Sequence, residues 1–287
     1  MLAEKVHQKT MLARAERPAS RRLPLPVRDF ALYVSGPLAV IAVWEWVGRR
    51  HLLAHGLFPP FSAVMVAWFN WVFGVGGRHT IYSGTWLGHA LASTERIVLG
   101  FLVGTLIAAV VGVLVGWSDP VSKMVDPSIN VIRPISVTAW IPLALIIFGI
   151  GNRPAIFLTS LATFFPVYVN TVAGVRFAEG KLTRAAKMLG ASDAQLLLRV
   201  ILPAALPSIL TGVRVAAAIA WTTVIVAEIL GAKSGLGYVL IDAYNLFQFP
   251  YVIAAMFSVG LLGFITDRLL LVFIDRQLRW VGKGAGR

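Results

Sequence analysis

The ionisable side chains inside the apolar segments of this chain are the first candidates for chemistry. Glu228 lies near the end of one apolar run, and Arg214 lies near its beginning. A charge in a lipid-embedded segment is costly and usually serves a function, such as the binding of a solute or an ion. The favoured interpretation of Glu228 is nevertheless structural: a position at the outer interface and a pair with Lys233 or with a backbone group. For Arg214, which could meet an anion, snorkelling towards the inner interface is favoured.

The remaining polar motifs lack the spacing of a catalytic or metal centre. Residues 231–235 resemble half of a phosphate-binding loop, but such a loop needs a glycine directly before its lysine, and Ala232 precedes Lys233. His51 and His55 are expected to share a helix face, yet no third ligand lies nearby in the sequence. We therefore expect no catalytic residue, no metal site and no ATP site on this chain.

A shortage of charge defines the class of protein. Of the 287 residues, 57% are hydrophobic and only 14% are charged, which is too little charge for the surface of a soluble domain. The apolar runs are continuous rather than alternating, which favours membrane-spanning helices of about 20 residues over the strands of a barrel. The net charge of +13 fits basic loops on the cytoplasmic side better than it fits nucleic-acid binding.

The polar segment between two of the apolar runs carries the clearest local signals. Residues 181–189 favour a helix with an apolar stripe, and Gly190 follows where a helix end needs a left-handed residue. Ser192 and Gln195 have the spacing of a capping box that begins a second helix, which we expect to end at Pro203. The apolar stripe of the first helix consists of Leu182, Ala185, Ala186 and Leu189.

This first short helix needs a surface to pack against. A helix of about 9 residues, roughly 14 Å long, is too short to be stable alone in water. Its apolar stripe must therefore pack either on the spans of its own chain or in a groove of a partner protein. The pattern alone leaves both alternatives open.

The same segment resembles a motif of one family of transport proteins. The pattern Ala185-Ala186-x-x-x-Gly190-x9-Val200-x-Leu202-Pro203 is similar to the EAA motif of ABC importer permeases. Within that family, the chain resembles the nitrate, sulfonate, taurine and bicarbonate permeases from about residue 30 to its end. The segments that carry this closer resemblance are Ser93-x-x-Arg96-x-x-x-Gly100-Phe101, Arg133-Pro134-Ile135-x-x-x-Ala139-Trp140-Ile141-Pro142-Leu143, Phe148-Gly149-Ile150-Gly151, Leu202-Pro203-Ala204-Ala205-Leu206-Pro207, Gly212-x-Arg214, Ala227-Glu228 and Gly235-Leu236-Gly237.

The resemblance implies an all-α integral membrane protein with the type I ABC importer permease (MetI-like) fold, six transmembrane helices and a cytoplasmic coupling helix. It implies a homodimer of permeases in the lipid bilayer, an external solute-binding protein and two copies of an ABC ATPase subunit. ATP would be bound by that ATPase, with no cofactor on this chain and no nucleic acid as a partner. The solute class that it implies is a small oxyanion: nitrate, a sulfonate, taurine or bicarbonate.

The resemblance also defines two sets of candidate site residues. Those expected to couple to the ATPase are Arg184, Ala185, Ala186, Leu189, Gly190, Ala191, Leu202 and Pro203. Those expected near the translocation pathway are Trp140, Arg214 and Glu228. Arg184 stands where the motif has glutamate, so a role for a carboxylate is not carried over, while the spacing of the segment is kept.

The elements that position these residues follow from the apolar runs. The expected parts are a cytoplasmic basic tail (1–30), a first transmembrane helix with external interfacial helices (31–96), the permease transmembrane domain (97–276) with its coupling loop (176–203), and a cytoplasmic C-terminal tail (277–287). The predicted spans cover residues 31–48, 97–117, 135–150, 155–175, 206–229 and 251–274. With the N-terminus inside, 20 Lys and Arg fall on the cytoplasmic side and 6 outside. This favours a multi-pass protein of the bacterial inner membrane with both termini in the cytoplasm.

The second predicted span carries a set of glycines on one helix face, namely Gly100, Gly104, Gly112 and Gly116. Small residues at this spacing let two helices approach closely. Sliding contacts during a conformational change and static tight packing are equally compatible with the pattern.

An alternative function from another class is a secondary transporter driven by an ion gradient. Such a protein should carry acidic or histidine residues in the middle of its spans, and often an internal repeat. Neither feature is evident in the sequence, so the ATP-driven importer is favoured.

Overall fold

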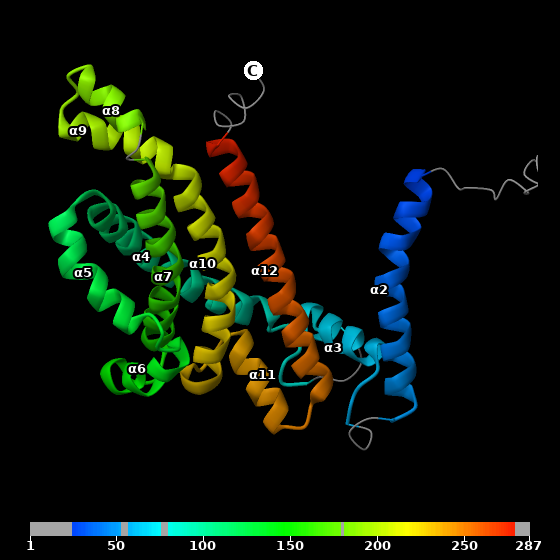
Figure 1. Ribbon diagram of the computed structural model, residues 1–287. Coiled ribbons are helices and arrows are strands. Elements are labelled where there is room, and N and C mark those ends of the chain that lie inside the picture. Colours follow the sequence, from blue (N-terminus) through cyan, green and yellow to red (C-terminus); the bar gives the residue numbers. More distant parts are fainter. Residues whose placement is uncertain (1–24, 53–56, 76–79, 179–180, 279–287) are drawn as a thin grey trace, which may run out of the picture. The chain divides into compact units, whose positions relative to one another are not determined.

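The computed structural model describes residues 25–52, 57–75, 80–178 and 181–278. Within these ranges every regular element is a helix (Figure 1). The chain divides into two compact units, Met1–Ser62 and Ala63–Arg287. Most of the two predicted tails lies outside the described residues, and the predicted division into four parts stays a prediction.

The first unit contains one long helix, α2 (Leu25–Arg49), which covers the predicted first span. The chain that follows folds back along the end of this helix. The indole N–H of Trp44 donates a hydrogen bond to the carbonyl of Pro59 at 3.0 Å. The carboxylate of Glu45 accepts hydrogen bonds at 2.9 Å from the backbone N–H and the hydroxyl of Ser62. The carboxylate of Glu45 therefore has hydrogen-bond partners within the first unit.

The histidine pair considered in the sequence is not formed as expected. His51 lies past the end of α2 with a φ of +53°, so it is not on a helix face, and that expectation is wrong. His55 lies outside the described residues. Among the residues that the structure describes, no group of three or more His, Cys, Asp or Glu could hold a metal ion.

The second unit is built from long helices joined by short ones (Figure 1). Its elements are α3 (Phe61–Phe73, which begins just before the unit boundary), α4 (Trp86–Trp117), α5 (Asp119–Ile132), the 3-10 helix η2 (Val137–Trp140), α6 (Ile141–Phe148), α7 (Asn152–Ala178), α8 (Lys181–Met188), α9 (Asp193–Leu196), the π-helix η3 (Leu197–Ile201), α10 (Leu202–Gly231), α11 (Leu236–Asn245) and α12 (Phe249–Gln277). Buried side chains of α4, α7 and α10 form a central core: Ala108, Val115, Val167, Tyr168, Val172 and Ala216.

The number of membrane crossings can be compared with the prediction. Among the described residues, four helical stretches are long and apolar enough to span a bilayer: α4, α7, the run Asp193–Gly231 and α12. A fifth crossing results if α5 and the η2–α6 segment, which meet at 88°, form one broken span. The all-α membrane architecture is therefore confirmed, whereas the count of six stays a prediction.

Helix α4 begins earlier than expected. The sequence predicts an amphipathic piece over 80–96 that leads into a span from residue 97. The structure has one continuous helix from Trp86 to Trp117. Arg96 is 1% exposed, because its charge is compensated inside the protein, so the helix has no reason to end there. The predicted break between two elements at residue 97 is therefore wrong, whereas an interfacial position of residues 86–96 stays a prediction.

The glycine face of α4 is a tight contact with α7. A Cβ added at Gly100 would lie 2.6 Å from the Cβ of Thr159, and one added at Gly112 would lie 2.8 Å from the Cβ of Thr171. The pairs along this contact are Gly100 with Thr159, Gly104 with Thr163, Gly112 with Thr171 and Gly116 with Val175. The partners advance along α7 in the same order and at the same spacing, so the two helices run parallel.

The direction of α10 relative to α7 follows from contacts of the same kind. Gly174 of α7 contacts Ser208, and Gly212 of α10 contacts Asn170. This order is reversed, so α10 runs antiparallel to α7. Since α4 and α7 are parallel, the segment α5–η2–α6 must return the chain between them. The observed directions agree with α5–η2–α6 acting as the broken span.

We expect Gly100→Ala to destabilise the protein by about 1–3 kcal/mol, because the added methyl overlaps Thr159 and the carbonyl of Ile156. Gly88→Ala is the matched control on the same helix, since nothing lies within 4 Å of its added Cβ. That variant should be neutral or more stable by roughly 0.5–1 kcal/mol. Thermal unfolding of the purified protein, followed by tryptophan fluorescence, measures both. Equal unfolding temperatures would contradict tight packing of this face.

Candidate functional site

The short helix expected at residues 181–189 is present as α8 (Lys181–Met188), and its end has the predicted geometry. Gly190 has a φ of +80°, which few residues other than glycine adopt. The N–H of Ala191 donates to the carbonyl of Ala186 at 3.1 Å, and the N–H of Gly190 donates to the carbonyl of Lys187 at 3.0 Å. This pair of bonds is a Schellman motif, which satisfies carbonyls that the helix end leaves free.

The second helix of the segment begins at the predicted capping box. The hydroxyl of Ser192 accepts a hydrogen bond from the N–H of Gln195, and the Gln195 side chain accepts one from the N–H of Ser192. The two caps at Gly190 and Ser192 fix a sharp turn between α8 and α9.

The expected stop at Pro203 is wrong. Pro203 lies in the first turn of α10, and the helical run continues from Asp193 to Gly231. The turn before it, η3, has π-helical hydrogen bonding. A proline in a continuing helix removes one hydrogen bond and crowds the preceding turn, and the wider π turn accommodates both effects.

Among the described side chains of α8 and its cap, one side packs on the rest of the molecule and the other is open. Ala186 packs against a buried cluster formed by Val175, Ala178, Leu196, Ile201 and Ala205. Met188 and Leu189, in contrast, are both 89% exposed. The predicted apolar stripe is thus divided: Ala186 packs on the chain itself, whereas Leu189 is open, beside Met188. Figure 1 shows α8 and α9 at one end of the second unit, with α11 near the opposite end.

The opposite end contains a buried ion pair that sequence reasoning missed. The guanidinium of Arg96 on α4 donates to Glu228 on α10 at 2.5 Å, and both side chains are about 1% exposed or less. The expected pair of Glu228 with Lys233 is therefore wrong. The expected backbone contact exists, since the N–H of Gly237 donates to Glu228 at 2.9 Å. The hydroxyl of Ser93 also donates to this carboxylate.

The remaining donors of Arg96 bring two further segments to the same place. Its guanidinium donates to the side-chain oxygen of Asn152, at the start of α7, at 2.8 and 3.0 Å. It also donates to the carbonyl and to the hydroxyl of Ser234, both at 2.8 Å. A buried charge is tolerated when it is paired and fully hydrogen-bonded. The cluster therefore fastens the first third of α4 to the start of α7, the end of α10 and the start of α11.

The three predicted pathway residues are not brought together. Arg214 forms a two-point pair with Asp267 on α12, at 2.9 and 3.2 Å, with both side chains nearly half exposed. Trp140 lies in η2, and its buried indole N–H has no hydrogen-bond partner in the described part of the chain. The residue after it, Ile141, lines a hollow of about 240 Å³ that also presents Thr138, Thr222 and Thr223. Neither Arg214 nor Glu228 lines that hollow.

Comparisons with known proteins agree with one another. Residues 98–279 match the family model described as binding-protein-dependent transport system inner membrane component. The chain is 33% identical to the taurine transport system permease protein TauC of Escherichia coli, over 99% of this chain and 98% of that protein. It is 29% identical to the nitrate import permease protein NrtB of Synechococcus elongatus, over 90% of each chain. A solved inward-facing structure of the MetNI methionine ABC transporter matches with a TM-score of 0.55 and 22% identity, over 68% of this chain and 95% of that one.

Proposed function

The chain belongs to the family of binding-protein-dependent transport system inner membrane components, and from this premise we propose that it imports small oxyanions with energy from a separate ATPase. The similarity to permeases named for taurine and for nitrate transport supports the solute class. Both solutes carry a compact anionic group with several oxygen atoms. Sulfonates, nitrate, taurine and bicarbonate are the candidates.

The observation that carries the coupling proposal is the open side of α8. Met188 and Leu189 are large, apolar and almost fully exposed, which is unfavourable unless a partner covers them. The caps at Gly190 and Ser192 hold these side chains on a rigid turn. An amphipathic helix of this kind fits an apolar groove of a partner protein. The partner that we propose is the cytoplasmic ABC ATPase, which binds the ATP.

The proposed assembly has two copies of this permease, two ATPase subunits and one external solute-binding protein. Both termini and α8 face the cytoplasm in this arrangement. ATP binding draws the ATPases together and moves the two α8 helices with them, and the long helices then change from an inward-open to an outward-open packing. Such a permease needs two packings of similar free energy, which nucleotide and binding protein favour in opposite directions.

An ion-gradient-driven transporter fits the site less well. Its coupling carboxylate has to take up and release a proton or an ion during each cycle. Glu228 is the buried carboxylate in the described spans, and its oxygens are occupied by Arg96, Ser93 and Gly237. Because fixed donors already occupy the oxygens of Glu228, a structural role of this carboxylate is favoured over a role in ion coupling.

Labelling of a single cysteine tests the proposed side of α8. The chain has no native cysteine, so Met188→Cys gives a signal without background. A membrane-impermeant maleimide should label it in inside-out vesicles but not in intact spheroplasts, and the ATPase should protect it. Tyr244→Cys, on the exposed end of α11, is the control and should show the opposite pattern. Labelling of Met188→Cys from outside would exclude coupling to a cytoplasmic ATPase.

A further inference from the structure

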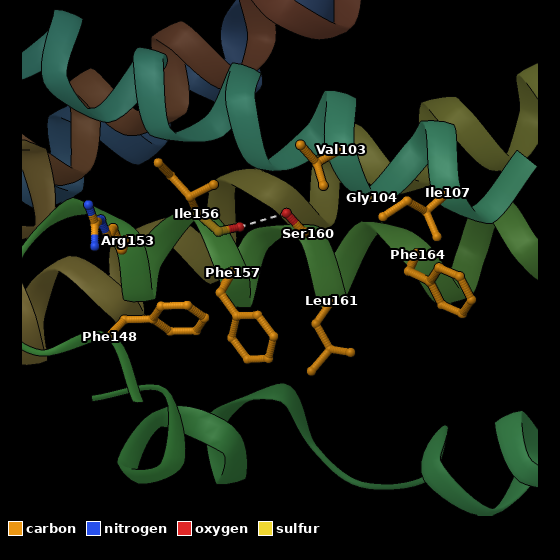
Figure 2. Close-up of a pocket in the computed structure, with 10 residues that line it drawn as sticks. All are labelled: Val103, Gly104, Ile107, Phe148, Arg153, Ile156, Phe157, Ser160, Leu161 and Phe164. Atoms are coloured by element: carbon orange, nitrogen blue, oxygen red, sulfur yellow. Dashed lines mark hydrogen bonds between the residues drawn. The ribbon is translucent and has the colours of Figure 1, made fainter. Parts of the chain in front are cut away.

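An apolar groove runs between α4 and α7 near the end of α6. It encloses about 440 Å³, a volume typical of small-molecule sites. Its walls include Val103, Ile107, Phe148, Phe157, Leu161 and Phe164. The hydroxyl of Ser160 also faces the groove, but it donates its proton to the carbonyl of Ile156 at 2.8 Å, as the dashed line in Figure 2 shows. The groove therefore offers hydrocarbon contacts and almost no hydrogen bonding.

One end of this groove meets a polar hollow. Figure 2 shows Arg153 and Phe148 at one end of the groove and Phe164 at the other. The hollow, of about 510 Å³, shares Phe148 and Arg153 with the groove and adds Lys233 and Ser234. An apolar compartment and a basic compartment thus adjoin at Phe148 and Arg153.

The backbone segments that carry Arg153 and Lys233, the two cations of the hollow, are fixed by the buried cluster around Arg96. The N–H of Gly151 donates to the carbonyl of Gly231 at 2.9 Å, and Arg96 joins the neighbouring residues Asn152 and Ser234. Arg153 and Lys233 themselves are exposed. Within the described part of the chain, neither of them forms an ion pair. Two uncompensated positive charges therefore flank the mouth of an apolar groove.

The depth of the groove matches one leaflet of a membrane. From Arg153 to Phe164 the helix α7 advances 11 residues, which corresponds to roughly 16 Å along its axis. Half of a hydrocarbon core of about 30 Å is about 15 Å. Since Arg153 stands at the start of a spanning helix, its charge lies near the interface and the groove extends towards the bilayer centre.

We infer that this site binds an anionic phospholipid, with one acyl chain in the groove and the phosphate between Arg153 and Lys233. A free oxyanion would use the two cations but not the apolar groove. An apolar helix of another chain would fill the groove but leave the cations uncompensated. A phospholipid with a negatively charged headgroup satisfies both compartments. The site lies at the end opposite α8 and does not involve the proposed ATPase contact.

Native mass spectrometry of the full chain tests the inference, with phosphatidylglycerol and phosphatidylcholine of identical acyl chains as probes. The wild type should retain one phosphatidylglycerol per chain and prefer it about tenfold or more. Arg153→Gln with Lys233→Gln should abolish this preference. Val103→Trp, which fills the groove, should lower the retention of both lipids, and Leu161→Trp should do the same if the first variant expresses poorly. Lys123→Gln with Arg199→Gln removes two exposed cations elsewhere and should change nothing.

Three outcomes would overturn the inference. The first is an unchanged headgroup preference in the Arg153→Gln and Lys233→Gln protein. The second is binding of inorganic phosphate by the wild type, lost in that protein, together with lipid retention that Val103→Trp leaves intact; the hollow would then bind free anions. The third is dissociation of permease dimers by Val103→Trp without loss of lipid, which would assign the groove to a second copy of this chain.

Discussion

Glu228→Ala is expected to destabilise the protein by about 3–5 kcal/mol, because it leaves the guanidinium of Arg96 buried without its counter-charge. For a chain of this size, the loss corresponds to a fall in Tm on the order of 10 °C. The cost is large because the side chain of Arg96 is only 1% exposed, so water cannot replace the lost carboxylate. Thermal unfolding in detergent, followed by tryptophan fluorescence, measures the change.

Asp267→Ala is the matched control for this experiment. It removes the partner of Arg214, but that pair is nearly half exposed, and exposed ion pairs contribute only about 0–1 kcal/mol. Glu228→Gln should fall between the two, since it removes the charge and keeps most of the shape. If Glu228→Ala and Asp267→Ala lower the Tm equally, the buried cluster does not stabilise the permease as inferred.

The second large effect is expected on ATPase binding. Replacing Leu189 with aspartate should weaken association with the ATPase by about 30-fold or more, because it places a charge where an apolar partner surface is proposed. Folding should be unaffected, since Leu189 is 89% exposed and has little packing to lose. Co-purification of the tagged permease with its ATPase, with membrane insertion measured in parallel, gives both quantities.

Three further variants separate the chemistry of this surface from its shape. Leu189→Met keeps an apolar side chain and should bind normally. Gly190→Leu has free space around its Cβ but requires a φ of +80°, so it should distort the turn and release the ATPase. Gly190→Asn tolerates that conformation and should retain binding. Normal co-purification of Leu189→Asp would remove α8 from the coupling interface.

The features that sequence predicted best are those set by near neighbours in the chain. Gly190 and the capping box at Ser192 were recognisable because each cap joins residues no more than five positions apart. The long apolar helices were recognisable for a similar reason, since one continuous run determines each of them.

The features that sequence predicted poorly depend on distant contacts. Glu228 was assigned to Lys233 or to a backbone group, and the backbone contact, with Gly237, is present. Its charged partner, however, is Arg96, which is 132 positions away. No local pattern indicates such a pair. A weak signal was present all the same: Arg96 directly precedes one apolar run and Glu228 lies near the end of another, and two such opposite charges stabilise one another when both are buried. Because the pairing of Arg96 was not recognised, the predicted span began at residue 97, inside the helix that the structure shows from Trp86.

The glycine face of α4 lies between these cases. The spacing of Gly100, Gly104, Gly112 and Gly116 identified the correct face, but it did not identify α7 as the partner. The structure favours tight packing for this state, because an added methyl would overlap the facing helix at all four positions. Likewise, Pro203 marked a real irregularity, although the helix continues through it as α10.

The cluster around Arg96 has a mechanical consequence. The cluster fixes Asn152, the first residue of α7. The helix α8 comes next in the chain after the other end of α7. With 27 residues, α7 is about 40 Å long. Because α4 and α10 pack along α7, we expect the three helices to rotate together about the pinned end. A rotation on the order of 15°, as found in allosteric assemblies, would carry the far end of these helices through about 10 Å while the pinned end stays in place. Leverage of this kind would let a modest rotation of these helices accompany a large displacement at the end that carries α8.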